Sequence, residues 1–92
     1  MLKIKKGFLL RRLGDEYMAV AIGEASKNFN GMIRLNETGA FYWEILEKGT
    51  TEEELLEKTL ERYQEVDKET ARIDIKDFLN SISIALDDDA DN

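Results

Sequence analysis

The sequence predicts an α+β domain in which a three-stranded antiparallel sheet is followed by three helices (βββααα). Apolar runs in the first 35 residues are short, partly β-branched and bounded by glycine or asparagine, as is typical of strands. After residue 36 the apolar residues recur every three or four positions, which is typical of amphipathic helices. A block of strands followed by a block of helices favours the α+β class over alternating βαβ units.

The strands are expected at residues 8–13, 17–22 and 32–35. The first two runs flank Gly14-Asp15, which can supply the positive backbone angles of a tight hairpin turn. Residues 23–31 form a polar connection to the third strand, and Phe29 within this connection is expected to reach the core.

The third strand is expected to lie at an edge of the sheet. Strands adjacent in sequence tend to pair, so the first two form the hairpin and the third lies on one outer side of it. Arg34 is the one charged residue of this run that could block the addition of another strand. The edge therefore either accepts a strand from another chain or is too short to pair with one. A proline at Ile33 is expected to remove one N–H group from it.

Capping residues define the three helices. The first is expected to open at Asn36, whose side chain can accept from free N–H groups, and to end at Gly49. Thr51 and Glu54 form a capping box at the start of the second. The third opens at Asp67 and runs to about residue 86. The apolar stripe of the first helix consists of Phe41, Tyr42, Ile45 and Leu46, with Trp43 at its margin.

The third helix carries apolar residues on two faces. Its buried stripe is centred on Ile75, and Ile73 and Ile84 point in nearly the opposite direction. A helix that only covers a core does not need these isoleucines, although scattered exposed isoleucines are common. The flanks between the two faces carry Arg72 and Lys76 on one side and Asp74 and Ser81 on the other.

The composition excludes several kinds of site. The chain contains no cysteine and no histidine. It therefore cannot form disulfides, metal sites with thiolate or imidazole ligands, or Ser-His triads. The glutamates at 52–54 are explained by helix capping, and the six glycines are too scattered to form a phosphate loop. We therefore expect no catalytic residue, no metal, no cofactor and no enzymatic activity of the chain alone.

The charge limits the partners. Acidic residues outnumber basic ones by 20 to 13, and a net charge of −7 disfavours nucleic acids and anionic membranes. No run approaches the roughly 18 apolar residues of a membrane-spanning helix. We expect a cytoplasmic protein with one domain at residues 1–86 and an acidic disordered tail at residues 87–92.

The series of motifs resembles the PqqD-like domains, named after the small protein of pyrroloquinoline-quinone biosynthesis and also called RiPP recognition elements. The resemblance rests on MIRLNETGAFYWEILEKGTTEEELLEKTLERYQEVD, residues 32–67, followed by a long helix with an apolar stripe. It implies a winged-helix-like domain without enzymatic activity. Such domains bind the leader segment of a ribosomally made precursor peptide and present it to a modifying enzyme, often a radical SAM protein.

The resemblance also implies where a peptide would bind. In the family the leader adds as a strand to the third strand and lies between it and the third helix, so that main-chain hydrogen bonds give affinity. Arg34 and two basic residues of the helix could pair with acidic leader residues, whereas the overall charge would suit a leader with basic positions. The implied peptide-binding residues are Met32, Ile33, Arg34, Leu35, Arg72, Ile73, Ile75, Lys76 and Leu79.

Two other functions stay open at this point. A winged-helix shape also suggests a DNA-binding regulator, but that class usually carries a basic recognition helix, whereas the second helix here begins TEEELLEK. A homodimeric assembly factor could use the free edge of the third strand to pair two copies of the chain.

Overall fold

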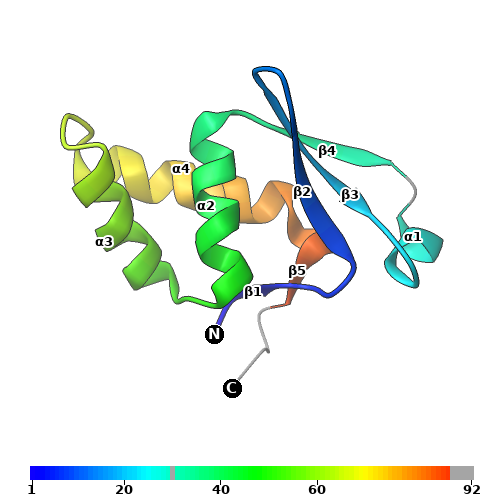
Figure 1. Cartoon of the computed structure of the whole chain (residues 1–92). Helices are drawn as coiled ribbons and strands as arrows, with labels where there is room; N and C mark the ends of the chain where they lie inside the picture. The colour runs from blue at the N-terminus through cyan, green and yellow to red at the C-terminus, as the bar shows by residue number, and fades with distance from the viewer. Residues whose placement is uncertain (30, 88–92) are drawn as a thin grey trace.

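The computed structural model describes residues 1–29 and 31–87, and it confirms the predicted α+β class. A three-stranded antiparallel sheet precedes three main helices, in the winged-helix-like order (Figure 1). The strands are β1 (Lys3–Ile4), β2 (Phe8–Leu13), β3 (Glu16–Ala21), β4 (Met32–Leu35) and β5 (Leu86–Asp87). The helices are α1 (Ala25–Asn28), α2 (Glu37–Lys48), α3 (Glu52–Arg62), α4 (Lys68–Ser81) and a 3-10 turn, η1 (Ser83–Ala85).

The main sheet has the strand order β2-β3-β4, so β4 lies at an edge as predicted. Gly14 adopts a positive φ of 63° in the turn that joins β2 to β3. In the middle of the sheet Leu10 pairs with Ala19, and Ala19 pairs with Ile33. Ala19 is fully buried, so this row of residues faces the helices and the core.

The predicted caps are present at all three main helices. The side chain of Asn36 accepts a hydrogen bond from the Gly39 N–H at 2.7 Å, and this fixes the point at which β4 becomes α2. Thr51 opens α3 with a complete capping box, and Asp67 caps α4. Because Asn36 follows β4 directly, the cap also holds the end of the edge strand in place.

The helix α4 is shorter than the sequence predicts. It ends at Ser81 instead of continuing to about residue 86, because Ile82 leaves the helical conformation and the chain enters η1 and then β5. Ile82 and Ala85 are both fully buried in this arrangement. Ile82 and Ala85 are three positions apart, a spacing that also fits a continuing helix, so the sequence pattern did not reveal the end of α4 at Ser81.

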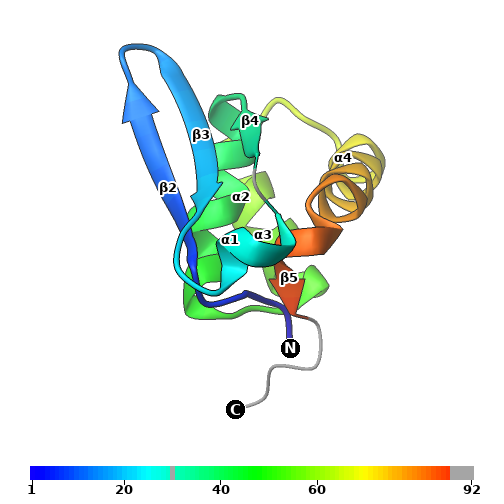
Figure 2. The ribbon, with the colours of Figure 1, turned by 90° about the vertical axis from the view of Figure 1, so that its right-hand side faces the viewer.

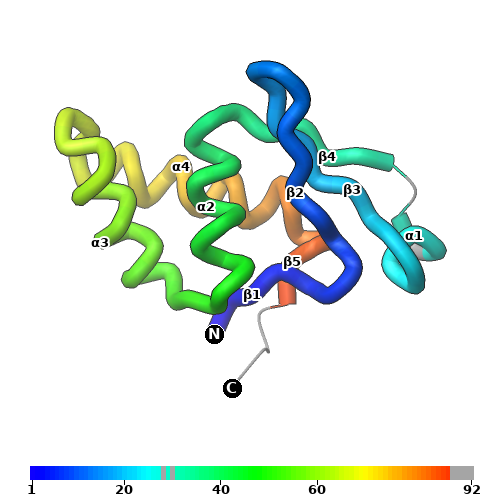
Figure 3. The backbone as a smooth tube through the Cα atoms, viewed as in Figure 1, coloured from blue at the N-terminus to red at the C-terminus, as the bar shows by residue number. Residues whose placement is uncertain are grey.

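Two short strands that the sequence analysis missed close the base of the domain. β1 pairs antiparallel with β5, and Figure 3 shows the two strands side by side. Lys5 donates its backbone N–H to the Ala85 carbonyl at 2.8 Å, which extends this contact. Asp87 belongs to β5, so the structure continues one residue past the predicted domain boundary, and the rest of the predicted tail lies outside the described residues.

The helix α2 lies between two apolar clusters and is buried on both sides. On the sheet side, Trp43 packs with Phe8 and Leu46. On the other side, Tyr42 packs with Leu55 of α3 and Ile75 of α4. Trp43 is 0% exposed, so the expectation that it lies at the margin of the helix stripe is wrong. A single-stripe interpretation fails for a helix that is covered on opposite faces.

The connection between β3 and β4 contains the short helix α1 and reaches the core as predicted. Gly7 has a φ of +96°, and a Cβ atom there would lie 2.7 Å from the Cβ of Ala25. The glycine therefore allows the turn before β2 to approach α1 closely. Phe29 packs against the sheet-side cluster, with its ring centroid 6.1 Å from that of Phe8. Within the described residues, no helix has the length and apolar character needed to cross a membrane.

Candidate functional site

Among the described residues, β4 pairs with β3 on one side and with no strand on the other. Along an antiparallel strand, consecutive residues direct their N–H and C=O groups to opposite sides. Ile22, directly after β3, donates its N–H to the Gly7 carbonyl at 2.7 Å, on the β2 side. Ala19 is three positions earlier and therefore directs its polar groups toward β4, where its partner is Ile33.

The same alternation shows which groups of β4 face outward. The N–H and C=O groups of Ile33 point to β3, so those of Met32 and Arg34 point to the free edge. Choosing Ile33 as the position where proline would weaken the edge is therefore wrong, because its amide belongs to the sheet. The free edge offers two outward-facing backbone positions, Met32 and Arg34, to an added strand.

The side chains of β4 alternate between the core and an outer face of the sheet. Ile33 and Leu35 are half-buried and pack against the sheet-side cluster, whereas Met32 is 52% exposed. The outer face contains two cross-strand rows that end on β4, Leu9-Val20-Met32 and Arg11-Met18-Arg34. A guest strand beside β4 would extend both rows, and a guest carboxylate opposite Arg34 would be paired with its guanidinium.

The helix α4 lies beyond β4 on the side away from β3 (Figure 2). Phe78 of α4 and Leu35 of β4 both lie close to Gly39. A Cβ atom at Gly39 would be 3.2 Å from the Phe78 ring and 3.5 Å from the Cβ of Leu35. Asp74 of α4 accepts a hydrogen bond from the Tyr42 hydroxyl at 2.7 Å. Both contacts fix α4 relative to the C-terminal end of β4.

The five α4 residues implied by the family resemblance are distributed around the helix. Arg72 and Lys76 form ion pairs with Glu53 and Glu52 of α3 at 3.6 and 3.0 Å, on the flank opposite Asp74. Ile75 is 1% exposed and belongs to the core, Leu79 is half-buried, and Ile73 is 55% exposed. The fold thus does not gather these five residues on one surface facing β4, and their contact with a ligand stays a prediction.

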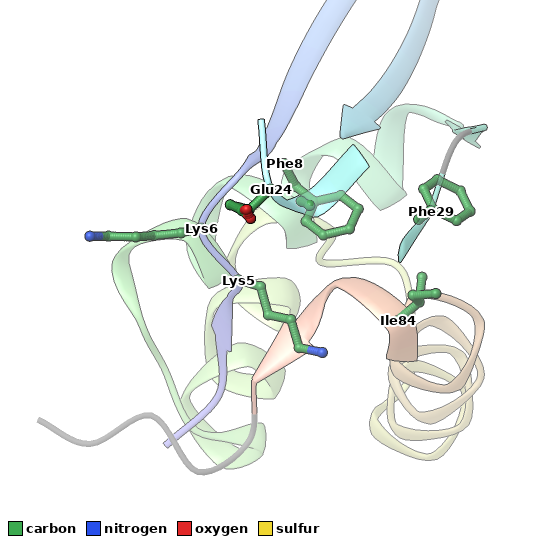
Figure 4. A pocket seen from close by; sticks show the side chains of 7 residues that line it. Lys5, Lys6, Phe8, Glu24, Phe29 and Ile84 are labelled. Carbon is green, nitrogen blue, oxygen red and sulfur yellow. The ribbon is translucent and has the colours of Figure 1, made fainter. Parts of the chain in front are cut away.

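A pocket lies near each end of β4. At the C-terminal end, a pocket of about 290 Å³ is lined by Arg34, Leu35 and Asn36 and by residues 15–17 of the hairpin. At the N-terminal end, a pocket of about 430 Å³ is lined by Phe8, Phe29 and Ile84, with Lys5 and Lys6 at its rim (Figure 4). The first pocket includes the last two residues of β4, and Phe29 of the second pocket lies three residues before Met32.

The charges are divided unevenly along the chain. Residues 1–34, which form the main sheet except Leu35, contain seven Lys and Arg against three Asp and Glu, a net charge of +4. Residues 35–92, which include the three main helices, contain six Lys and Arg against seventeen Asp and Glu, a net charge of −11. The edge strand therefore lies at the border of a basic sheet and an acidic helical layer.

Among residues 1–29 and 31–87, no group of three His, Cys, Asp or Glu side chains is arranged to hold a metal ion. Burial raises the pKa of Tyr42, and its hydrogen bond to Asp74 raises it further. This pair joins α2 to α4 and performs a packing role.

The family model for "Coenzyme PQQ synthesis protein D (PqqD)" matches residues 9–83, which span the main sheet and all three main helices. The chain belongs to the PqqD family. A solved structure described as TbiB1 in complex with the TbiA(beta) leader peptide is similar, with a TM-score of 0.76 and 25% sequence identity. The match covers 97% of this chain and 99% of that chain. A comparison with curated protein sequences finds no match.

The PqqD resemblance inferred from the sequence is therefore confirmed, whereas the larger of the two pockets near β4 was not predicted. Lys5, Phe29 and Ile84 line the larger pocket, although they come from three separate segments. Phe29 had been assigned to the core and Ile84 to an exposed helix face. Only the break of α4 at Ser81 and the turn at Gly7 bring them together, and neither is visible as a periodic pattern.

Proposed function

We propose that this PqqD-family domain is a non-catalytic peptide chaperone. It binds the leader segment of a ribosomally made precursor peptide by strand addition to β4 and presents it to a modifying enzyme, which we propose to be a radical SAM protein. The observation that carries the proposal is the free edge of β4, where Met32 and Arg34 direct their N–H and C=O groups outward. The similarity to a chain solved with a leader peptide supports leader-peptide binding.

The rigid support of the edge favours binding. β4 is short, but Asn36 caps the following helix and the half-buried Ile33 and Leu35 pack against the core. An edge that is already ordered loses little conformational entropy when a peptide pairs with it. We expect dissociation constants in the micromolar range or tighter for a guest of this size, which corresponds to about 8 kcal/mol.

The test uses peptides that the protein itself selects. A phage-displayed library of random peptides about 15 residues long, which span roughly 50 Å when extended, is selected on the wild-type domain, and selected peptides are synthesised for calorimetry. Arg34→Pro removes an outward N–H, whereas Arg34→Ala removes the guanidinium and keeps the N–H. Arg34→Pro is expected to weaken binding by about tenfold beyond Arg34→Ala, which corresponds to one lost hydrogen bond.

Both variants should retain the wild-type melting temperature within a few degrees, because Arg34 is exposed and its N–H faces solvent. Equal peptide affinities of folded Arg34→Pro and Arg34→Ala would contradict strand addition at β4.

A second use of the same edge is a homodimer in which two copies of β4 pair. The free edge favours this alternative as much as it favours a peptide guest. Sedimentation over a range of protein concentrations, with and without a selected peptide, distinguishes the two. A peptide that dissociates dimers shows that both use β4, whereas a dimer unaffected by peptide and by Arg34→Pro would lie elsewhere.

A further inference from the structure

The pocket at the N-terminal end of β4 is lined by both apolar and charged side chains. Phe8 and Phe29 form an aromatic floor with ring centroids 6.1 Å apart, and Ile84, which is 42% exposed, forms an apolar side. Lys5 and Lys6 stand at the rim, and in Figure 4 the Lys5 side chain extends toward Ile84 while Lys6 extends to the other side. The pocket thus combines an apolar interior with cationic edges.

The rim carries excess positive charge. Neither Lys5 nor Lys6 forms an ion pair with another residue of the described part of the chain. The one acidic residue that lines the pocket, Glu24, is already paired with Lys27 at 3.2 Å. An incoming carboxylate in the pocket would therefore meet the Lys5 ammonium group, which forms no ion pair with a described residue, whereas Lys6 extends to the other side (Figure 4).

Phe29 brings the pocket close to the start of β4. The Phe29 ring lies 3.6 Å from the position of a Cβ on Gly31, the residue directly before β4. At about 3.3 Å per residue, a guest strand that continues past Met32 reaches Phe29 within two or three residues. A guest paired antiparallel to β4 arrives there with its C-terminal part.

We infer that this pocket, formed by Phe8, Phe29 and Ile84 with Lys5 and Lys6, is a specificity site for the guest peptide. It takes a large apolar or aromatic side chain that is followed or preceded by Asp or Glu, C-terminal to the segment that pairs with β4. The inference rests on the proposed strand addition and adds the chemistry of the peptide to it. The Lys5 ammonium group would allow a chain with a net charge of −7 to bind a guest with acidic residues.

The experiment uses the peptides selected from the random library on the wild-type domain. They are expected to share an apolar residue adjacent to Asp or Glu, on the C-terminal side of the pairing segment. Lys5→Glu should weaken such a peptide by about tenfold, and replacing the acidic peptide residue by Lys should recover most of this loss on the variant. Ile84→Asn should weaken it by a similar factor through lost apolar contact.

Matched controls separate the pocket from general effects. Lys68→Glu makes the same charge change at the start of α4, and Leu13→Asn makes a similar polar substitution at a residue that is 70% exposed in the hairpin. Both should bind the peptide as the wild type does. Equal losses for Lys5→Glu and Lys68→Glu would overturn the inference, because the effect would then be long-range charge only.

The two proposals fail in different ways. If Arg34→Pro abolishes binding while Lys5→Glu and Ile84→Asn leave it unchanged, strand addition stands and the pocket inference is overturned. If the pocket variants change self-association measured by sedimentation but not peptide affinity, the pocket is a contact between copies and the inference is also overturned. If Arg34→Pro and Arg34→Ala bind equally while the pocket variants lose affinity, the pocket binds peptide and strand addition fails.

Discussion

The hydrogen bond between Tyr42 and Asp74 joins α2 to α4. The phenol ring is buried beside Phe78, with ring centroids 5.1 Å apart, while the carboxylate lies at the exposed flank of α4. Burial raises the pKa of Tyr42 above its ordinary value, and the carboxylate of Asp74 raises it further. The folded protein therefore holds this proton to a higher pH than the unfolded chain does.

This sets the pH dependence of stability in the alkaline range. The contribution of Tyr42 is complete below the unfolded tyrosine pKa of about 10 and is lost as the pH rises above it. Tyr42→Phe should cost about 1 kcal/mol at neutral pH and should make the loss of stability above pH 10 less steep. Urea unfolding at a series of pH values measures both quantities, with Tyr17→Phe as the control. An alkaline slope unchanged by Tyr42→Phe would contradict this account.

Among the elements, β4 shows most clearly what the sequence could and could not specify. Its bounds, its edge position and its capped junction with α2 were predicted, because alternation and the Asn36 cap are local signals. The direction of each backbone group was not predictable, since it depends on the register with β3 and on the contact between Ile22 and Gly7.

The sequence analysis also missed the end of α4, the pairing of β1 with β5 and the burial of Trp43. Each depends on what the rest of the chain places beside the segment.

The alternating directions of the backbone N–H and C=O groups along β4 give a stability prediction for Ile33. Ile33→Pro removes an N–H that faces β3, and it leaves a carbonyl unpaired beside the fully buried Ala19. We expect a loss of about 2 kcal/mol, or roughly 10 °C in melting temperature for a domain of this size. Calorimetry of Ile33→Pro beside Arg34→Pro checks it. Equal melting temperatures would show that the assigned directions are wrong.

At the scale of the whole molecule, the separation of charge matters more than the net charge. The value of −7 suggested repulsion of any acidic partner, yet the first 34 residues carry +4 and provide both strands of the hairpin, all but one residue of β4 and the rim of the larger pocket. The candidate edge could be predicted from sequence because it is one continuous segment. The pocket could not, because Lys5, Phe29 and Ile84 meet only after the chain folds.

The separation of charge predicts a salt dependence. A selected peptide that carries Asp or Glu should lose affinity by about threefold to tenfold when sodium chloride is raised from about 0.05 to 0.5 M, because screening shortens the reach of the basic sheet. A version with the acidic residues changed to Asn or Gln should change little. Calorimetry of both peptides at two salt concentrations gives the comparison, and parallel behaviour of the two would argue against charge recognition.

The burial of Trp43 has a practical consequence for solution work. The indole is the only one in the sequence, it is shielded from water, and it meets the edge of the Phe8 ring with 6.5 Å between centroids. Phe8 in turn forms part of the floor of the larger pocket. Intrinsic fluorescence of the unlabelled protein thus has a natural emitter one aromatic ring away from the site where we place the guest's apolar side chain. Guests that occupy that site should perturb the emission spectrum more than guests that only pair along the backbone near Leu35.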